Sequence, residues 1–207
     1  KTGKKDDVVS IILFVYSLFS NFVFPQQGGF CLKFDGLNDY VSLPNNASFQ
    51  PTGGNFTSEA WIRLDADGGN DQKILMNLTW SGGVKGYAMN IYKNGSGNFH
   101  FAASIYLSGS EYWVSDDSYV IAPNVWTHVA MTWSVNGYLR AYVNGKLVGE
   151  TSTSSSIYTS TSLSSNMGCG NESNWGFFKG QIDEMRIWDV ERSANDIRSD
   201  MYKEILP

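Results

Sequence analysis

From Gly28 onward the chain breaks into short runs in which apolar and polar residues tend to alternate, separated by clusters of Gly, Asn, Asp, Ser or Pro. A period of two is typical of a strand with one buried face, and closely spaced short strands favour a β-sandwich. No long amphipathic helical pattern interrupts them. The runs that we expect to form strands are Cys31–Phe34, Tyr40–Leu43, Phe56–Leu64, Lys73–Leu78, Tyr87–Tyr92, Phe99–Ser104, Tyr112–Ser115, Trp126–Trp133, Tyr138–Val143, Lys146–Glu150, Ser162–Cys169 and Gly180–Trp188.

Two Asn-Gly dipeptides, Asn136-Gly137 and Asn144-Gly145, lie between such runs. Asn and Gly tolerate the positive φ that a two-residue type I′ turn requires, so we expect two consecutive hairpins. The inward faces of the first hairpin are expected to carry Val129, Met131 and Trp133 on one strand and Leu139, Ala141 and Val143 on the other.

One short helix is predicted near the end of the chain. Ser193 and Asp196 have the spacing of a variant capping box, and Ile197 and Met201 are separated by one helical turn. The hydroxyl-rich stretch Thr151–Ser165 predicts an exposed loop or edge hairpin.

The first 27 residues differ from the rest. A charged start, Lys1–Asp7, precedes the apolar run Val8–Phe24 and then Pro25. This is the pattern of an export signal, and it predicts a signal peptide or N-terminal membrane anchor over residues 1–27 and one domain over 28–207. The alternative is that the apolar run is a buried strand or helix of the fold itself.

Composition agrees with one all-β domain. The 207 residues are 42% hydrophobic, 14% aromatic and only 17% charged, which suits pleated strands better than helices with charged outer faces. The net charge of −5, with scattered Lys and Arg, lacks the positive field that nucleic acid needs. We therefore exclude nucleic acid as a partner, and we expect no membrane-embedded partner beyond the N-terminal anchor.

Five segments, in order, resemble one known family. The stretch CLKFDGLNDYVSLP is similar to the first hairpin of laminin-G-like domains, and four later segments are similar to further motifs of that family. The resemblance, to the laminin-G-like and concanavalin A-like lectin/glucanase jelly-roll family, implies an antiparallel two-sheet jelly roll and extracellular or cell-surface binding. The four later segments are Phe56–Leu64, Trp126–Trp133, Ala141–Val148 and Phe177–Ile197.

Catalysis is not expected. Glycosidases on this fold need two facing carboxylates, and no strand carries the Glu-x-Asp-x-x-Glu spacing. The 2 histidines, His100 and His128, have no partner at zinc spacing, and His128 fits a structural position of the family pattern. We therefore expect a binding or adhesion module for glycans or extracellular proteins. The alternatives are a non-catalytic accessory domain of a larger extracellular protein and, less favoured, a glycoside hydrolase-like enzyme.

The candidate ligand residues lie on one strand and two loops. Glu59, Trp61 and Arg63 share one strand face, where an aromatic ring between charged groups is typical of a sugar site. The alternative is that Trp61 is packed and the two charges pair across strands. Trp80 and Trp175 are candidates on loops at the rim of the sandwich.

The family resemblance also implies a structural calcium ion. Asp35, Asn38 and Asp39 concentrate oxygen ligands in one turn, and in similar domains the residue at the position of Asp183 approaches that turn. The alternative is an Asx-turn at Asp35, with Asp183 bonded to backbone N–H groups.

Two covalent modifications are expected outside the cell. Cys31 and Cys169 are the 2 cysteines, and export predicts a disulfide between them; the alternative is two buried free thiols. The Asn-x-Ser/Thr sequons predict N-glycans, with Asn94 the most accessible. The sequons are at Asn46, Asn55, Asn77, Asn94 and Asn171.

Overall fold

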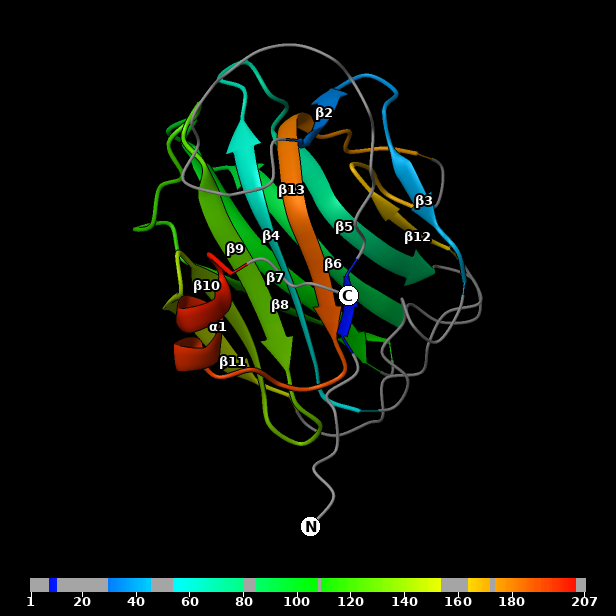
Figure 1. Ribbon diagram of the computed structural model, residues 1–207, viewed down its shortest axis with the longest axis vertical. Coiled ribbons are helices and arrows are strands. Elements are labelled where there is room, and N and C mark those ends of the chain that lie inside the picture. Colours follow the sequence, from blue (N-terminus) through cyan, green and yellow to red (C-terminus); the bar gives the residue numbers. More distant parts are fainter. Residues whose placement is uncertain are drawn as a thin grey trace.

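Two antiparallel β-sheets lie face to face in the computed structural model of the chain (Figure 1). The residues that the structure describes are 8–10, 30–45, 54–79, 85–107, 109–153, 164–171 and 174–203. This arrangement is the antiparallel two-sheet jelly-roll sandwich predicted from the strand pattern, and each expected run supplies a strand.

The first sheet has seven strands among the described residues, in the order β1-β13-β4-β9-β10-β11, with β2 also paired to β13. All of its pairings are antiparallel. Its strands are β1 (Val8–Ser10), β2 (Leu32–Asp35), β4 (Phe56–Leu64), β9 (Thr127–Trp133), β10 (Tyr138–Val143), β11 (Lys146–Ser152) and β13 (Lys179–Trp188).

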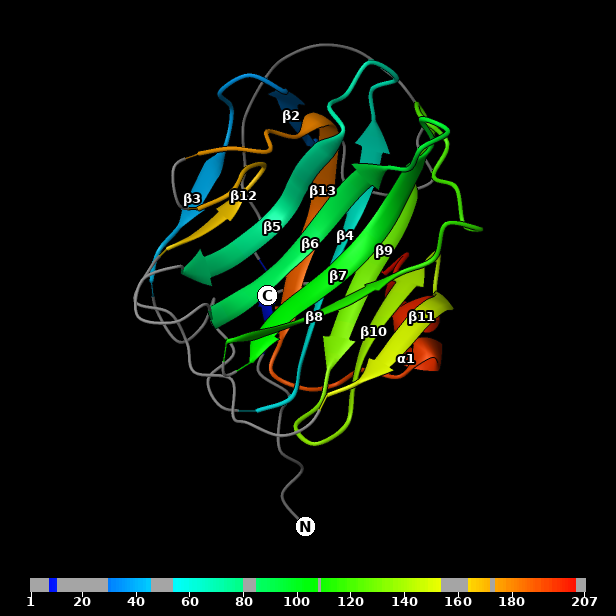
Figure 2. The same ribbon diagram turned by 180° about the vertical axis from the view of Figure 1, so that it is seen from behind.

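The second sheet has six strands in the described part of the chain, in the order β3-β12-β5-β6-β7-β8, and it faces the viewer in Figure 2. Strands β5 to β8 are consecutive both in sequence and in space, and each pairs antiparallel with the next. Its strands are β3 (Val41–Leu43), β5 (Asp71–Thr79), β6 (Lys85–Lys93), β7 (Phe99–Leu107), β8 (Ser110–Ser115) and β12 (Ser165–Met167).

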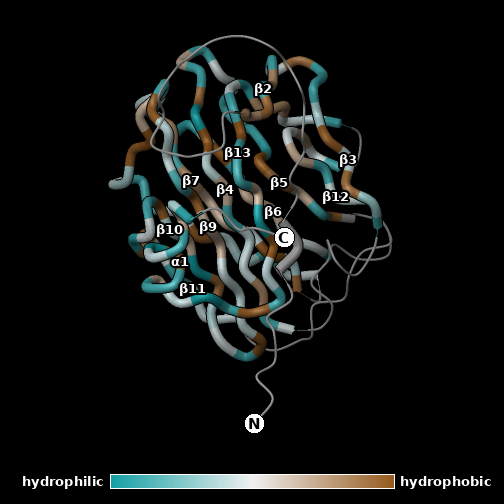
Figure 3. Tube along the Cα trace, in the orientation of Figure 1, coloured by the Kyte–Doolittle hydropathy of each residue, from teal (hydrophilic) through white to brown (hydrophobic). Residues whose placement is uncertain are grey.

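The main hydrophobic core lies between the two sheets. Hydrophobic and hydrophilic residues alternate along many of the strands in Figure 3, and the inward set is fully buried. Phe56 packs against Tyr87 of the opposite sheet and Trp133 of the neighbouring strand, with ring centroids 4.9 and 6.0 Å apart. Each buried side chain of this size stabilises the fold by about 1.5–3 kcal/mol. The inward residues predicted for β9 and β10 are all in this core.

The two Asn-Gly turns differ. Asn144 and Gly145 have φ of 50° and 70° and connect β10 to β11 directly, as a type I′ turn requires. The prediction of a second two-residue turn is wrong, because β9 and β10 are joined by four residues, 134–137. There the Gly137 N–H donates to the Ser134 carbonyl at 3.0 Å, and Asn136 alone has a positive φ, of 56°.

The predicted C-terminal helix is confirmed as α1 (Ala194–Asp200), which lies on the outer face of the seven-stranded sheet (Figure 1). Ser193 caps it and forms the expected capping box with Asp196. Ile197 is fully buried against Ala130 and Tyr142, so one face of the helix covers strands β9 and β10.

Part of the expected leader is a strand. Val8–Ser10 form β1, which pairs with Arg186–Trp188 of β13 at one edge of the sheet. Residues 1–7 and 11–29 lie outside the described residues, so the assignment of residues 1–27 as a signal peptide or anchor stays a prediction. The described part of the chain contains no helix with the length and hydropathy that a membrane-spanning segment needs.

Candidate functional site

The face of β4 that was expected to bind a sugar is covered by the C-terminal segment. Glu59 and Trp61 do share this face, but their exposed fractions are 0% and 6%. The Trp61 indole N–H donates to the Met201 carbonyl at 2.7 Å, just beyond α1. Arg63, at the end of the strand, donates to the Asn124 carbonyl at 3.1 Å. The prediction of a sugar site there is therefore wrong for this conformation, because the helix segment occupies the space.

The Glu59 carboxylate is the centre of a buried charge cluster. Its Oε1 accepts hydrogen bonds from Trp188 Nε1 at 3.0 Å and Arg192 Nη1 at 3.1 Å, and Arg186 Nη1 lies 3.7 Å away. Burial raises the pKa of the Glu59 carboxyl, and the two guanidinium groups oppose that rise. Arg186 and Arg192 come from the C-terminal part of the chain, so the cluster joins β4 to β13 and to the segment that leads into α1.

His128 is a structural part of the same region. Its ring lies 5.3 Å from the Trp61 ring, and its Nε2 is 3.9 Å from Glu59 Oε2. Burial lowers the pKa of His128 to about 3, with further lowering by Arg186 and Arg192. The imidazole is therefore neutral at physiological pH, and the structural position expected for His128 agrees with its place beneath the C-terminal segment.

The turn that was expected to hold calcium uses its carboxylates internally. Asp35 Oδ1 accepts hydrogen bonds from the backbone N–H groups of Leu37, at 2.7 Å, and Asn38, at 3.2 Å. Asp39 Oδ2 accepts from the Asp35 N–H at 3.1 Å. These bonds, above all that from Leu37, lower the pKa of the Asp35 carboxyl. This is the Asx-turn that was the alternative to a metal site.

Asp183 does not approach this turn. In the antiparallel register Asp35 lies opposite Lys179, and Asp183 is four residues further along β13, a separation of about 13 Å at strand rise. Its carboxylate accepts from the Glu184 N–H at 2.8 Å, and burial raises the pKa of Asp183 to about 6. Among the described residues no three His, Cys, Asp or Glu side chains form a group that could hold a metal ion.

A lysine side chain packs beside this turn, since a Cβ on Gly36 would lie 2.8 Å from the Cβ of Lys179. Lys179 Nζ pairs with Asp67 Oδ2 at 2.6 Å, and this bond, with the nearby charges of Asp65 and Asp35, raises the pKa of Lys179. The predicted calcium ligands Asp35, Asn38, Asp39 and Asp183 do not come together in this register, and the ammonium of Lys179 pairs with Asp67.

The predicted disulfide is absent from the described structure. Cys31 and Cys169 are both free thiols, the first exposed and the second buried. Cys31 precedes β2 of one sheet, where its Sγ accepts from Gln181 Nε2 at 3.1 Å. Cys169 follows β12 of the other sheet and contacts Asn166 Nδ2 at 3.4 Å. Since Cys31 is exposed, the alternative of two buried thiols fits only Cys169.

At two of the predicted glycosylation sites the side-chain nitrogen that a glycan would occupy donates a hydrogen bond within the fold. Asn77 is fully buried and donates from Nδ2 to Ser165 Oγ at 2.9 Å. Asn171 donates from Nδ2 to the Leu78 carbonyl and accepts from the Leu78 N–H, both at 2.8 Å. A glycan on either side chain would break these contacts, so the folded domain disfavours both. Asn55 is exposed, Asn94 is half-buried rather than the most accessible, and Asn46 lies outside the described residues.

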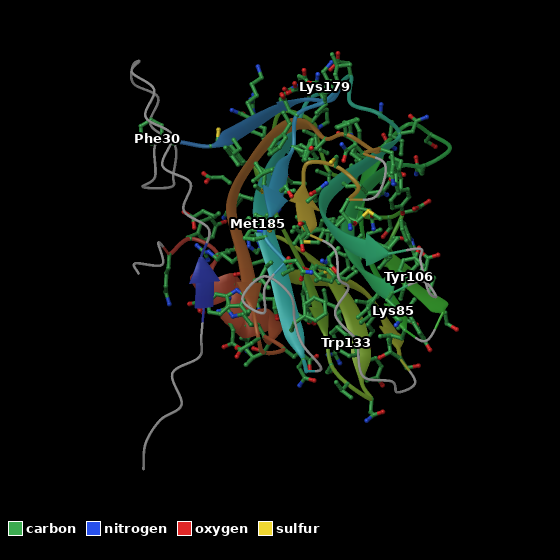
Figure 4. The ribbon with its side chains drawn as sticks, turned by 90° about the vertical axis from the view of Figure 1, so that its right-hand side faces the viewer. Phe30, Lys85, Tyr106, Trp133, Lys179 and Met185 are labelled. Atoms are coloured by element: carbon green, nitrogen blue, oxygen red, sulfur yellow. The ribbon has the colours of Figure 1, made fainter. Side chains whose placement is uncertain are left out.

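The outer face of the six-stranded sheet carries a second group of aromatic side chains. Met76, Leu78 and Ala88 form a cluster separate from the main core, and Tyr106 and Trp175 pack against it. Figure 4 shows Tyr106 on the side of the sandwich that faces away from β13. We call this surface, formed by the outward residues of β5 to β8 and by Trp175, the aromatic face.

Hydrogen bonds orient two rings of the aromatic face. Trp113, on the edge strand β8, is 43% exposed, and its indole N–H donates to Ser115 Oγ at 3.0 Å. The Tyr106 hydroxyl donates to Glu111 Oε1 at 2.7 Å. Both rings are therefore held in place while remaining accessible, and pre-oriented rings lose little conformational entropy on binding.

Trp175 lies at the opposite side of the aromatic face. Lys73 Nζ sits 4.3 Å from the centre of its ring and pairs with Asp71 Oδ1 at 2.6 Å. Gly170 permits this position, since a Cβ there would lie 2.7 Å from Trp175 Nε1. Of the ligand residues predicted from sequence, Trp175 is the one that the structure places on this face, and Trp80 lies outside the described residues.

Sequence reasoning missed Trp113, Tyr106 and Glu111. The signal was present in the alternation of β8, where Val114 points into the core and Trp113 must therefore point outward. An exposed aromatic with a nearby carboxylate can stack on a sugar ring and accept its hydroxyl hydrogen bonds. The aromatic face therefore has the chemistry that the face of β4 was expected to provide.

The sequence matches a family model, and the structure is similar to several solved structures. The family model, of laminin-G type and described as the concanavalin A-like lectin/glucanases superfamily, matches residues 34–198. A native heptameric SAP-like pentraxin from Limulus polyphemus is 15% identical, with a TM-score of 0.63 over 80% of this chain and 78% of its own. A proposed carbohydrate-binding protein from Bacteroides ovatus is 22% identical, with a TM-score of 0.60 over 82% of this chain and 48% of its own.

Toxin binding domains are also similar. The binding domain of Paraclostridial Mosquitocidal Protein 1 is 15% identical, with a TM-score of 0.65 over 82% of this chain and 42% of that chain. This chain thus spans less than half of that protein and of the Bacteroides protein. At these identities the likeness shows the fold alone. No curated protein matches the sequence.

Proposed function

Because this chain belongs to the concanavalin A-like lectin/glucanase superfamily, we propose that it is a non-catalytic module that binds a glycan through its aromatic face. The observation that carries the proposal is Trp113, whose ring is exposed on β8 and held by Ser115. Aromatic rings of this kind bind the apolar faces of sugars, and Glu111 supplies a carboxylate beside them.

Binding rather than hydrolysis is supported by the position of Glu59. A glycosidase needs a carboxyl with a raised pKa at the substrate, where it can donate a proton to the leaving group. Burial raises the pKa of Glu59, but its carboxylate lies beneath the C-terminal segment and is paired with Arg192. On the aromatic face, Glu111 is exposed and accepts the Tyr106 hydroxyl, which favours a ligand contact over proton donation.

A place outside the cell is part of the same proposal. The apolar leader predicts export, and the pentraxin and toxin binding domains share the fold. The partial coverage of two longer relatives favours a module within a larger protein. Export would bring the aromatic face into contact with glycans of the matrix or of another cell.

The test is a glycan array probed with the wild-type domain and two variants. Trp113→Ala should weaken binding at least about tenfold, as truncation of a central aromatic contact usually does. Tyr138→Ala is the matched control, because Tyr138 is 41% exposed but lies on β10 of the other sheet. Equal binding by Trp113→Ala and wild type, or a folded wild type that binds no glycan, would contradict the proposal.

A further inference from the structure

One corner of the six-stranded sheet combines exposed rings with carboxylates. We infer that this corner, formed by Trp113, Tyr92 and Asp117, binds an arginine side chain of a protein partner outside the cell. We call it the acidic corner. The ligand differs from the proposed glycan, and the inference stands whether or not a glycan binds, although Trp113 takes part in both.

The rings of the acidic corner are accessible and already oriented. Trp113 is 43% exposed, and its ring lies 5.8 Å from the Tyr92 ring at an interplanar angle of 62°. Ser115 Oγ accepts the Trp113 indole N–H at 3.0 Å, and the Tyr92 hydroxyl donates to Asp117 Oδ1 at 2.5 Å. A planar cation can therefore stack on a ring that is held in one orientation, which limits the entropy lost on binding.

The carboxylates beside these rings keep one oxygen each for a ligand. Asp117 is exposed, and its Oδ2 accepts no hydrogen bond from the described residues. Glu111, two residues before Trp113, is also exposed and uses only Oε1, which accepts the Tyr106 hydroxyl at 2.7 Å. Burial, and then the neighbouring carboxylate, raise the pKa of Tyr92 and of Tyr106, so both hydroxyls stay protonated and continue to donate. The free oxygens can accept hydrogen bonds from a charged donor.

The basic side chains of this sheet and its loops make other contacts. Lys73 pairs with an aspartate of its own strand at 2.6 Å, and Lys93 Nζ donates to a backbone carbonyl of the β4–β5 connection at 2.8 Å. Lys146 Nζ lies 5.3 Å from the centre of a tyrosine ring in the connection between β8 and β9. Among the ion pairs of the described residues, none includes Asp117 or Glu111. Their negative charge is therefore available to a cation.

A buried histidine lies next to the rings. His100 faces Tyr92 across the β6–β7 pair, its ring lies 5.4 Å from the Tyr92 ring, and it is 0% exposed. Its Nδ1 is 3.0 Å from the Tyr119 carbonyl oxygen, whereas its Nε2 has no hydrogen-bond partner among the described residues. Buried polar atoms without a partner are rare in folded proteins, so the acidic corner has one more polar group than the fold itself uses.

Arginine fits these groups better than lysine or a neutral ligand does. The indole N–H and the tyrosine hydroxyl of the corner already donate, to Ser115 and Asp117, so a ring and carboxylate oxygens remain for a ligand. A guanidinium group is planar, carries five donors and no acceptor, stacks on aromatic faces and pairs with carboxylates. Lysine offers a point charge without the planar face, and a neutral ligand offers no charge.

The experiment is an NMR titration of the isotopically labelled full chain with three pentapeptides. Each has two glycines on either side of a central residue, which is arginine, lysine or citrulline; citrulline keeps the planar shape of arginine without its charge. We expect the arginine peptide to shift the backbone amide signals of β8 saturably, the lysine peptide to bind more weakly and the citrulline peptide most weakly. High salt should weaken the arginine peptide because it screens exposed charges.

Two variants and a matched control locate the site. Trp113→Ala should weaken the arginine peptide at least about tenfold. Asp117→Asn keeps an oxygen that can accept the Tyr92 hydroxyl but removes the charge, and it should weaken the peptide about threefold, as loss of an exposed ion pair does. Asp189→Asn makes the same charge change at an exposed position after β13 of the other sheet and should leave the affinity unchanged. Circular dichroism would show that each variant is folded.

The outcomes separate this inference from the proposed function. Equal affinity for the arginine and citrulline peptides, or the same affinity in Asp117→Asn and Asp189→Asn, would overturn the arginine site. A lysine peptide that binds as tightly as the arginine peptide would overturn recognition of the planar guanidinium. None of these results touches the glycan proposal, because Asp117→Asn retains Trp113. A wild type that binds the arginine peptide but no glycan would overturn the proposed function and leave the acidic corner in place.

Discussion

His128 provides a quantitative test of how the C-terminal segment covers β4. The imidazole is 1% exposed and lies between Trp61 and the Glu59 carboxylate, with two arginines nearby. Replacing it in His128→Gln removes the titrating group and keeps a polar side chain of similar length. The pH dependence of the free energy of unfolding should therefore differ between wild type and variant, and the buried position of His128 determines the sign of the difference.

The magnitude follows from the pKa of His128, which is about 3 in the folded domain against an ordinary value of 6.5. Above pH 6.5 the histidine is neutral in both states and contributes no pH dependence. Between pH 6.5 and 3 the unfolded chain binds a proton that the folded domain does not, so acidification lowers the free energy of unfolding. At pH 5 this loss from His128 is about 2 kcal/mol.

The assay is urea unfolding of wild type and His128→Gln at pH 7 and pH 5. Wild type should lose about 2 kcal/mol more than the variant over this interval. Asp183, whose pKa is raised to about 6, acts with the opposite sign because the folded domain holds its proton between pH 3.8 and 6. Its contribution is present in both proteins and cancels in the difference. Equal pH dependence in the two proteins would refute the neutral, buried histidine.

Three further predictions concern the charge cluster, the first turn and the thiols. Glu59→Gln should lower the free energy of unfolding by about 3 kcal/mol in urea, because it leaves buried guanidinium groups less well paired, whereas the exposed Glu150→Gln should cost less than about 1 kcal/mol. Millimolar calcium should leave Tm unchanged because Lys179 pairs with a carboxylate near the turn, and an EGTA-reversible rise in Tm would contradict this. A thiol reagent should modify Cys31 in the native domain and Cys169 only after unfolding, and a native protein without a reactive thiol would show this assignment to be wrong.

The strands and the helix could be predicted because their signals are local. Alternation in Phe56–Leu64 fixed which residues share a face, and the capping box at Ser193 fixed the start of α1. The turn after β9 was mistaken because Asn-Gly also fits a four-residue connection, in which the Ser134 carbonyl accepts the closing hydrogen bond.

The site could not be predicted in the same way. Alternation shows which residues share a strand face, but it does not show which other segment packs over that face. Glu59 and Trp61 alternate correctly, but their partners Arg192 and Met201 lie more than a hundred residues away in sequence. In the sequence, Trp113 is one aromatic residue in a short predicted strand, and nothing beside it indicates a binding site. Its importance depends on the exposure of its ring, 43%, which is a property of the assembled sandwich.

The predicted calcium ligands do not come together for a related reason. Oxygen-rich residues in the first turn suggested a metal, and the register of β2 with β13 decided against it by placing Lys179 opposite Asp35. The amino-acid pattern of the two strands does not give their register, which depends on how the two ends of the chain pair.

The most direct test of the aromatic face is an NMR titration of the isotopically labelled domain with the tightest glycan from the array. We predict that the amide shifts concentrate on β5 to β8, with the indole N–H of Trp113 and of Trp175 among the most perturbed. Shifts confined to α1 and β4, or to the turn at residues 35–39, would contradict the account.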